Sequence, residues 1–219
     1  MDSREYGFEG ATPDVHGYAH VSHEATLVGD VTVAANANVW PGAVLRGDVG
    51  PVVVGRESAI GDNATLHAAT VGEKAMVGHG AVLNDATVGD GALVGFNSTV
   101  SEATIGAGSI VAMGTVVPPG YEVPEESFVR GMPASVTPLA ETAIDPEAVF
   151  EAFNSGDYAN LAQRHADLFA EQFGEVPEPC DLSGDDSSIS NAEAADLLGW
   201  EPARSWREAA DEDVAGPTV

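Results

Sequence analysis

Aliphatic residues recur at a fixed spacing through the middle of the chain. From Val54 to Val117 they stand six residues apart in groups of three, and each group repeats the previous one after 17 residues. The twelve positions are Val54, Ile60, Leu66, Val71, Val77, Leu83, Val88, Val94, Val100, Ile105, Val111 and Val117. A repeat of fixed period indicates a solenoid, because each unit can bury its apolar residues only against its neighbours.

The spacing predicts a triangular parallel β-helix, mainly β in class, in which three six-residue units make one coil. The aliphatic residue of each unit points inward and stacks on its equivalent in the next coil, and the small residues that follow it let the chain bend. We expect the stack to begin at Val15, Val21 and Val28 and to end at Val123 and Val129. The alternative, a β-sandwich of short strands, predicts no fixed offset between groups.

One coil departs from this period. Val33, Val39 and Leu45 fit the frame, but the step from Leu45 to Val54 is nine residues where five is normal. We therefore expect a loop of about four extra residues to bulge out within residues 46–53.

The chain divides into three parts by pattern. The β-helix is expected over residues 10–137, a C-terminal segment of α-helices over 138–173, and an acidic tail over 174–219. Asp145-Pro146 is a helix start and predicts a short helix to about Phe153. A second helix, from Asp157 to about Phe173, would place Leu161 and His165 on one packing face. Capping-box patterns at 190–193 and 205–208 predict two short helices in the tail.

The charge is strongly acidic. Asp and Glu number 35 against 8 Lys and Arg, which gives a formal net charge of -27, while 44% of the residues are hydrophobic. The charge excludes nucleic-acid binding through a basic face and disfavours an anionic membrane. The apolar content is sufficient for a folded core. A folded chain with such an acidic surface is typical of a salt-rich cytoplasm, so we infer a halophilic source.

We predict that the protein is stabilised by salt. The 27 unbalanced negative charges repel one another over a Debye length of about 30 Å at 0.01 M ionic strength but only about 3 Å at 1 M. Thermal unfolding followed by circular dichroism should therefore move to higher temperature as KCl is added. An unchanged melting temperature would contradict the halophilic interpretation.

Other sequence signals concern the compartment. Cys180 is the only cysteine, which excludes an internal disulfide and a paired-cysteine metal site. The first ten residues have neither a basic start nor an apolar stretch, and no apolar run approaches the ~20 residues of a membrane span. We therefore expect a cytoplasmic protein with no signal peptide.

The 17-residue offset also places polar residues in columns. The residue after the third aliphatic of each coil forms one column, Arg46, His67, Asn84 and Ser101, and the second residue after the middle aliphatic forms another, Pro41, Asp62, His79 and Phe96. His67 and His79 then lie on different faces of the prism and point in different directions. They can meet only if a second chain packs alongside, as in a cyclic trimer, so the sequence suggests a site shared between subunits.

Three blocks of sequence resemble the gamma-class carbonic anhydrase family. They are WPGAVLRGD at Trp40–Asp48, GDNATLH at Gly61–His67 and VGHGAVL at Val77–Leu83, and the resemblance runs over about residues 10–140. It implies a left-handed β-helix that forms a homotrimer. It also implies zinc, iron or cobalt held at each subunit interface by three histidines, two from one chain and one from its neighbour.

Carried over to this sequence, the resemblance makes His67 a metal ligand and His79 the ligand from the neighbouring chain. The third ligand falls on Asn84, where the family has histidine, and Gly61 stands where the family has a glutamine that orients the metal-bound water or substrate. A catalytic zinc ion normally has three protein ligands and one bound water. An amide oxygen is a weaker ligand for zinc than imidazole. We therefore expect weaker metal binding than in the family.

Arg46, Asp48 and Asp62 match the family pattern as well and are the candidate catalytic residues. For Arg46 and Asp48 the alternative is a structural ion pair that fixes the trimer. Asp62 stands one coil before His79 in its column and could accept a hydrogen bond from an imidazole or from Arg46.

These residues are compatible with three different functions. The first is metal-dependent hydration of carbon dioxide to bicarbonate, weakened or lost through Asn84. The second is a hexapeptide-repeat acyltransferase, in which His79 deprotonates an acceptor and coenzyme A lies along the prism edge. The third is a non-catalytic trimeric scaffold.

Overall fold

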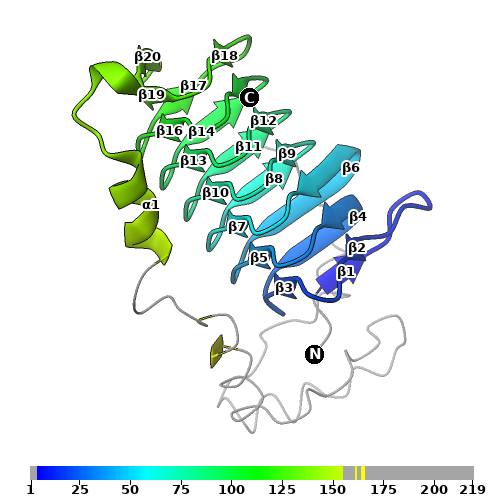
Figure 1. Ribbon diagram of the computed structural model, residues 1–219. Coiled ribbons are helices and arrows are strands. Elements are labelled where there is room, and N and C mark those ends of the chain that lie inside the picture. Colours follow the sequence, from blue (N-terminus) through cyan, green and yellow to red (C-terminus); the bar gives the residue numbers. More distant parts are fainter. Residues whose placement is uncertain (1–3, 155–160, 162–163, 166–219) are drawn as a thin grey trace, which may run out of the picture. The chain divides into compact units, whose positions relative to one another are not determined.

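The computed structural model describes residues 4–154, 161, 164 and 165. Its strands wind into coils that stack along one axis, with neighbouring coils joined by backbone hydrogen bonds (Figure 1). A mainly β solenoid is therefore confirmed. Within the described part of the chain, no helix has the length and apolar character needed to span a membrane.

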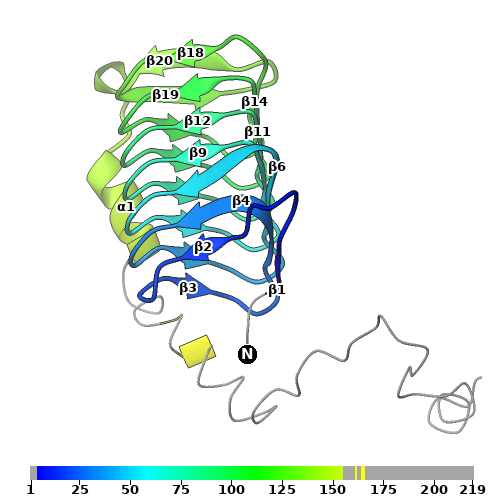
Figure 2. The same cartoon turned by 90° about the vertical axis from the view of Figure 1, so that its right-hand side faces the viewer.

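The strands belong to two sheets. The 12-stranded sheet contains β1 (Arg4–Tyr6), β2 (Asp14–Val15), β4 (Thr26–Val33), β6 (Val44–Val54), β8 (Thr65–His67), β9 (Thr70–Val71), β11 (Val82–Asn84), β12 (Thr87–Val88), β14 (Thr99–Ser101), β15 (Thr104–Ile105), β17 (Val116–Val117) and β18 (Glu122–Val123). The 8-stranded sheet contains β3 (His20–Val21), β5 (Asn38–Val39), β7 (Ala59–Ile60), β10 (Met76–Val77), β13 (Leu93–Val94), β16 (Ile110–Val111), β19 (Ser127–Arg130) and β20 (Ser135–Pro138). The long strands β4 and β6 turn a corner of the prism and join two of its faces (Figure 2).

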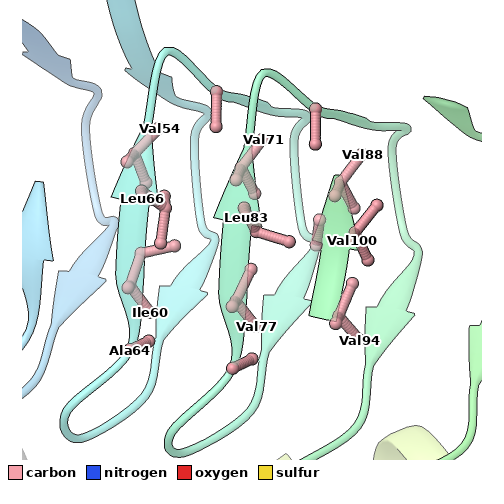
Figure 3. Close-up of a cluster of buried hydrophobic side chains, with 14 of the residues drawn as sticks. Val54, Ile60, Ala64, Leu66, Val71, Val77, Leu83, Val88, Val94 and Val100 are labelled. Carbon is pink, nitrogen blue, oxygen red and sulfur yellow. The ribbon is translucent and has the colours of Figure 1, made fainter. Parts of the chain in front are cut away.

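The register of the sheets follows the 17-residue offset. Leu66 pairs with Leu83 and Val77 pairs with Val94, in parallel strands. Figure 3 shows the resulting stacks of side chains in the interior, with Leu66, Leu83 and Val100 among them. The predicted arrangement of inward-pointing aliphatic residues is therefore confirmed over these coils.

Small residues occupy the buried positions next to the turns. Ala64, Ala81 and Ser98 follow one another at this spacing and are fully buried. The hydroxyl of Ser98 donates to the carbonyl of Ala112 at 2.9 Å, so the buried polar group is satisfied. The small side chains let the backbone turn without crowding the core.

The expected loop within residues 46–53 is instead part of a strand. β6 runs without a break from Val44 to Val54 and pairs with β4 on both sides of a bulge. Gly29 faces Gly47 while Val31 faces Val52, so the extra residues lie opposite a single step of β4. The prediction located the insertion correctly: residues 48–51 bulge opposite Asp30 without a partner in β4, although they continue the strand and form no separate loop.

The first coil also differs from expectation. Leu27, which is fully buried, pairs with Leu45, whereas Val28 pairs with Arg46 and is only partly buried. The inward residue is therefore Leu27, and the choice of Val28 was wrong by one position. The solenoid also starts before residue 10, because β1 pairs with β4.

The helix α1 (Pro146–Asn154) begins where Asp145-Pro146 predicts. The carboxylate of Asp145 accepts hydrogen bonds from the backbone N–H groups of Glu147 and Ala148 at 3.1 and 3.3 Å. Val149 and Phe150 pack on a small apolar cluster that includes Leu93 of β13, Ile110 of β16 and Leu139 of the 3₁₀ turn Leu139–Glu141. Most of the second expected helix, and both helices expected in the tail, lie outside the described residues.

Candidate functional site

Three neighbouring strands bring the first polar column together. Arg46 of β6 pairs with His67 of β8, and His67 pairs with Asn84 of β11. Parallel strands in register stack equivalent side chains on one face. The predicted juxtaposition of His67 and Asn84 within one chain is therefore confirmed.

Asp48 links Arg46 to His67. Its Oδ2 accepts hydrogen bonds from Nη2 and Nε of Arg46 at 2.6 and 3.1 Å, and its Oδ1 lies 3.1 Å from Nε2 of His67. The hydrogen bond from Arg46 is the main cause that lowers the pKa of Asp48, although partial burial opposes it. The ionised carboxylate can only accept a hydrogen bond. Nε2 of His67 therefore carries a hydrogen atom and donates a hydrogen bond to Asp48.

The other ring nitrogen of His67 faces Asn84. Its Nδ1 lies 3.1 Å from the side-chain oxygen Oδ1 of Asn84. With the ring proton on Nε2, a neutral His67 directs a lone pair at an oxygen that also carries lone pairs. The contact becomes favourable with a proton on Nδ1, with the Asn84 amide rotated so that Nδ2 donates to Nδ1, or with a metal ion bound by both atoms. Histidines that bind metals usually donate their second N–H to a carboxylate, as His67 does to Asp48.

His79 lies at the turn after β10, on the other sheet. Its Nδ1 accepts a hydrogen bond from the backbone N–H of Asp62 at 2.9 Å, and its ring stacks on Phe96 at 4.9 Å between centroids. The Asp62 carboxylate is 3.4 Å from the same nitrogen. Because Nδ1 accepts, the ring proton of His79 sits on Nε2 in this arrangement.

Gly61 explains why this histidine can come so close. A Cβ at position 61 would lie 2.7 Å from the backbone nitrogen of His79 and 2.9 Å from its Nδ1. Both distances are too short for a side chain at this position. The glutamine that the gamma-class carbonic anhydrase family has at this position therefore does not fit here while His79 accepts the hydrogen bond from the Asp62 amide.

His67 and Asn84 are suitably placed to bind a metal ion, but one chain does not supply a complete set of ligands. His67 and Asn84 present two donor atoms side by side, with Asp48 orienting the imidazole. His79 lies on a different face of the solenoid, and no group of three or more His, Cys, Asp or Glu within the described residues could hold a metal ion. A complete set of ligands therefore requires a second copy, and His79 would have to give up the Asp62 amide to offer a lone pair.

A groove that the sequence did not predict lies beside His79. It encloses about 920 Å³ and extends from Phe96 to His20, with His165 also in its wall. The indole of Trp40 contacts His20 at 6.1 Å and His165 at 5.7 Å between ring centroids. His165 therefore packs against the solenoid, in agreement with its predicted place on a packing face. Trp40 stands in the WPGAVLRGD block, but nothing in the sequence placed it between two histidines that are distant along the chain.

The partly buried position of His20 predicts a pH-dependent stability. Burial lowers the pKa of His20 below 6.5, and the nearby His165 lowers it further. The unfolded chain then takes up a proton first as the pH falls, so this contribution to stability is present above about pH 6.5 and is lost as the pH falls through the lower folded-state pKa. We expect the melting temperature to fall between pH 7.5 and 5.5, and to fall less in His20→Asn. Equal pH dependence in both proteins would contradict this assignment.

The comparisons with known proteins agree with the fold. Residues 51–85 and 86–119 match the family model described as the hexapeptide repeat of succinyl-transferase. A carbonic anhydrase from Geobacillus kaustophilus is 37% identical over 62 residues, which are 28% of this chain and 34% of that protein. The alignment therefore spans about a third of the length of this relative.

Two solved structures cover more of the chain. A hexapeptide transferase family protein from Anaplasma phagocytophilum has a TM-score of 0.68 at 29% identity, over 75% of this chain and 99% of that one. A proposed acetyltransferase from Bacillus cereus has a TM-score of 0.69 at 27% identity, over 77% and 99% of the two chains. The chain is thus a β-solenoid whose residues 51–85 and 86–119 match a hexapeptide-repeat model, and carbonic anhydrase and transferase proteins are among those that it is similar to.

Proposed function

We propose that the protein is a gamma-carbonic-anhydrase-like homotrimer that hydrates carbon dioxide to bicarbonate at a metal site between subunits. The observation that carries the proposal is the 3.1 Å contact of His67 Nδ1 with Asn84 Oδ1, with Nε2 of the same ring turned to Asp48. This arrangement places two donor atoms side by side, with the imidazole oriented by Asp48 as in known metal sites. The resemblance of Trp40–Asp48 and Val77–Leu83 to the family, and the relationship to a carbonic anhydrase, support the same function.

His67 and Asn84 of one copy and His79 of the next would hold the metal. When bound, zinc supplies a Lewis acid that lets water react with carbon dioxide near neutral pH. Asp48 holds His67 in the tautomer that leaves Nδ1 free, and Arg46 keeps Asp48 ionised. Because an amide oxygen is a weaker donor than imidazole, Asn84 lowers the affinity for zinc and with it the activity.

The proposal requires a trimer, because His67 and His79 of one chain lie on different faces. Multi-angle light scattering in molar KCl should give three times the mass of the 22.4 kDa chain. A monomeric mass would remove the neighbour that supplies His79 and would refute the shared site.

Metal content tests the ligands directly. Protein purified in molar salt without added zinc, or loaded with zinc and dialysed, should retain metal that His67→Ala and His79→Ala lose. His16→Ala is the matched control, because this histidine contacts Tyr18 and not the network. Retention in the control but not in the two variants supports the site. Wild-type protein without metal or carbon dioxide hydration would instead favour a trimeric scaffold that has lost the site.

The second candidate function is acyl transfer. It is favoured by the two structural relatives and by the groove beside His79. However, the nitrogen through which His79 would accept a proton already accepts the Asp62 amide hydrogen. A rise in melting temperature with acetyl-coenzyme A, absent with zinc, would favour this candidate over the first.

A further inference from the structure

The groove beside Trp40 has the size of a small-molecule site, and the lining that the structure describes comes from one chain. Its volume of about 920 Å³ lies in the range of ligand pockets in proteins. Trp40, Tyr18 and Phe96 supply aromatic surface, and His20, His165 and Asp62 supply polar groups. Aromatic walls with a few polar groups are typical of such sites.

The charges in the groove select against anions. Asp62 is the only acidic residue in its described lining, and that lining contains no Lys or Arg. Burial and the neighbouring His165 lower the pKa of His20, so this imidazole is neutral at neutral pH. In a chain of formal charge -27, a phosphate or carboxylate ligand would meet repulsion, and the described lining offers it histidines but no Lys or Arg.

The aromatic rings favour a particular kind of cation. A cation near the face of an indole, phenol or phenyl ring is attracted by the ring quadrupole, and alkylated ammonium groups are the usual ligands of such sites. Small inorganic cations keep their hydration shell unless several oxygen ligands replace it. The walls supplied by Trp40, Tyr18 and Phe96 offer aromatic carbon where such an ion needs oxygen.

From these features we propose that the groove binds a small organic cation of the quaternary ammonium class, with Trp40 and Tyr18 against the alkyl groups and Asp62 as the counter-charge. The groove adjoins the proposed metal site, because Asp62 contacts His79, and the test below therefore uses protein stripped of metal. The proposal differs from acyl transfer, because coenzyme A would bring phosphates to a groove whose described lining contains no Lys or Arg.

Isothermal titration of the full-length protein, stripped of metal with EDTA and held at constant KCl, tests the proposal. Choline is the cationic probe, and 3,3-dimethylbutan-1-ol is its neutral analogue of the same shape. We expect choline to bind at least tenfold more tightly than the alcohol. Equal affinity for the two probes would show a merely apolar groove and overturn the proposal, as would binding of acetyl-coenzyme A or phosphate that excludes choline.

Variants locate the cation. Trp40→Leu should weaken choline binding at least tenfold, and Asp62→Asn should weaken it while leaving the alcohol unaffected. Met113→Leu is the control, because this side chain is 73% exposed and lies outside the groove. Should Trp40→Leu fail to fold, Tyr18→Ala replaces it, because Tyr18 is 78% exposed and its loss leaves the core intact. Choline affinity that neither Trp40→Leu nor Tyr18→Ala changes would place the ligand elsewhere and refute the site.

Discussion

Asn84→His is expected to raise the zinc affinity of the protein at least tenfold, about 1.4 kcal/mol, and to increase its rate of carbon dioxide hydration. Position 84 pairs with His67 in the neighbouring strand, so an imidazole there completes a set of three with His67 and the His79 of a second copy. Competition with a fluorescent zinc chelator measures the affinity. Stopped-flow hydration with a pH indicator measures the rate, which should rise with pH through about 7.

The same variant separates the possible defects of the site. Adding His67→Ala or His79→Ala to Asn84→His should abolish the gain, whereas adding His16→Ala should not. Zinc binding without activity would mean that Gly61, in place of the family's glutamine, limits the reaction. No gain in zinc binding would mean that the two histidine columns do not meet across an interface.

Leu83→Ala is expected to lower the free energy of unfolding by about 2–5 kcal/mol, because it removes a fully buried side chain from the close-packed interior. Leu83 stacks between Leu66 and Val100 in adjacent coils, so the cavity would interrupt a continuous column. Chemical denaturation in molar KCl, followed by circular dichroism, measures the loss.

Val82→Ala on the same strand provides the control. This side chain is 38% exposed, and its truncation should cost under about 1 kcal/mol. If both variants lose the same stability, β-strand propensity rather than core packing governs this strand.

The repeat in the sequence was sufficient to predict the register of the coils. From Val54 to Val117 every coil has the same length, so the aliphatic residue that points inward follows from counting. Counting failed where the period changes. The extra residues of β6 bulge within a continuous strand, and the inward residue of the first coil is Leu27. β1 carries no repeat and forms through pairing with β4 alone, so nothing local in the sequence could reveal it.

The candidate site was predictable to the same extent. The column of Arg46, His67 and Asn84 follows from the period, and the structure adds that Asp48 reaches His67 across the bulge of β6. The groove was not predictable, because it depends on His165 reaching Trp40 from more than a hundred residues away in sequence. Contacts between residues so far apart depend on tertiary packing, which cannot be predicted from the period of the repeat.

The two ends of the stack bear on whether the protein can polymerise. A solenoid of identical coils exposes strand edges at both ends, and such edges can template end-to-end growth into fibres. Here the 8-stranded sheet ends in β20, which runs antiparallel to β19, so a further parallel coil of the same kind cannot add to it in register. At the opposite end β1 lies along β4, with the charged residues Arg4 and Glu5 exposed. The antiparallel β20 therefore closes one end of this sheet to a further coil, and deleting residues 135–138 should convert a discrete particle into one that grows with concentration.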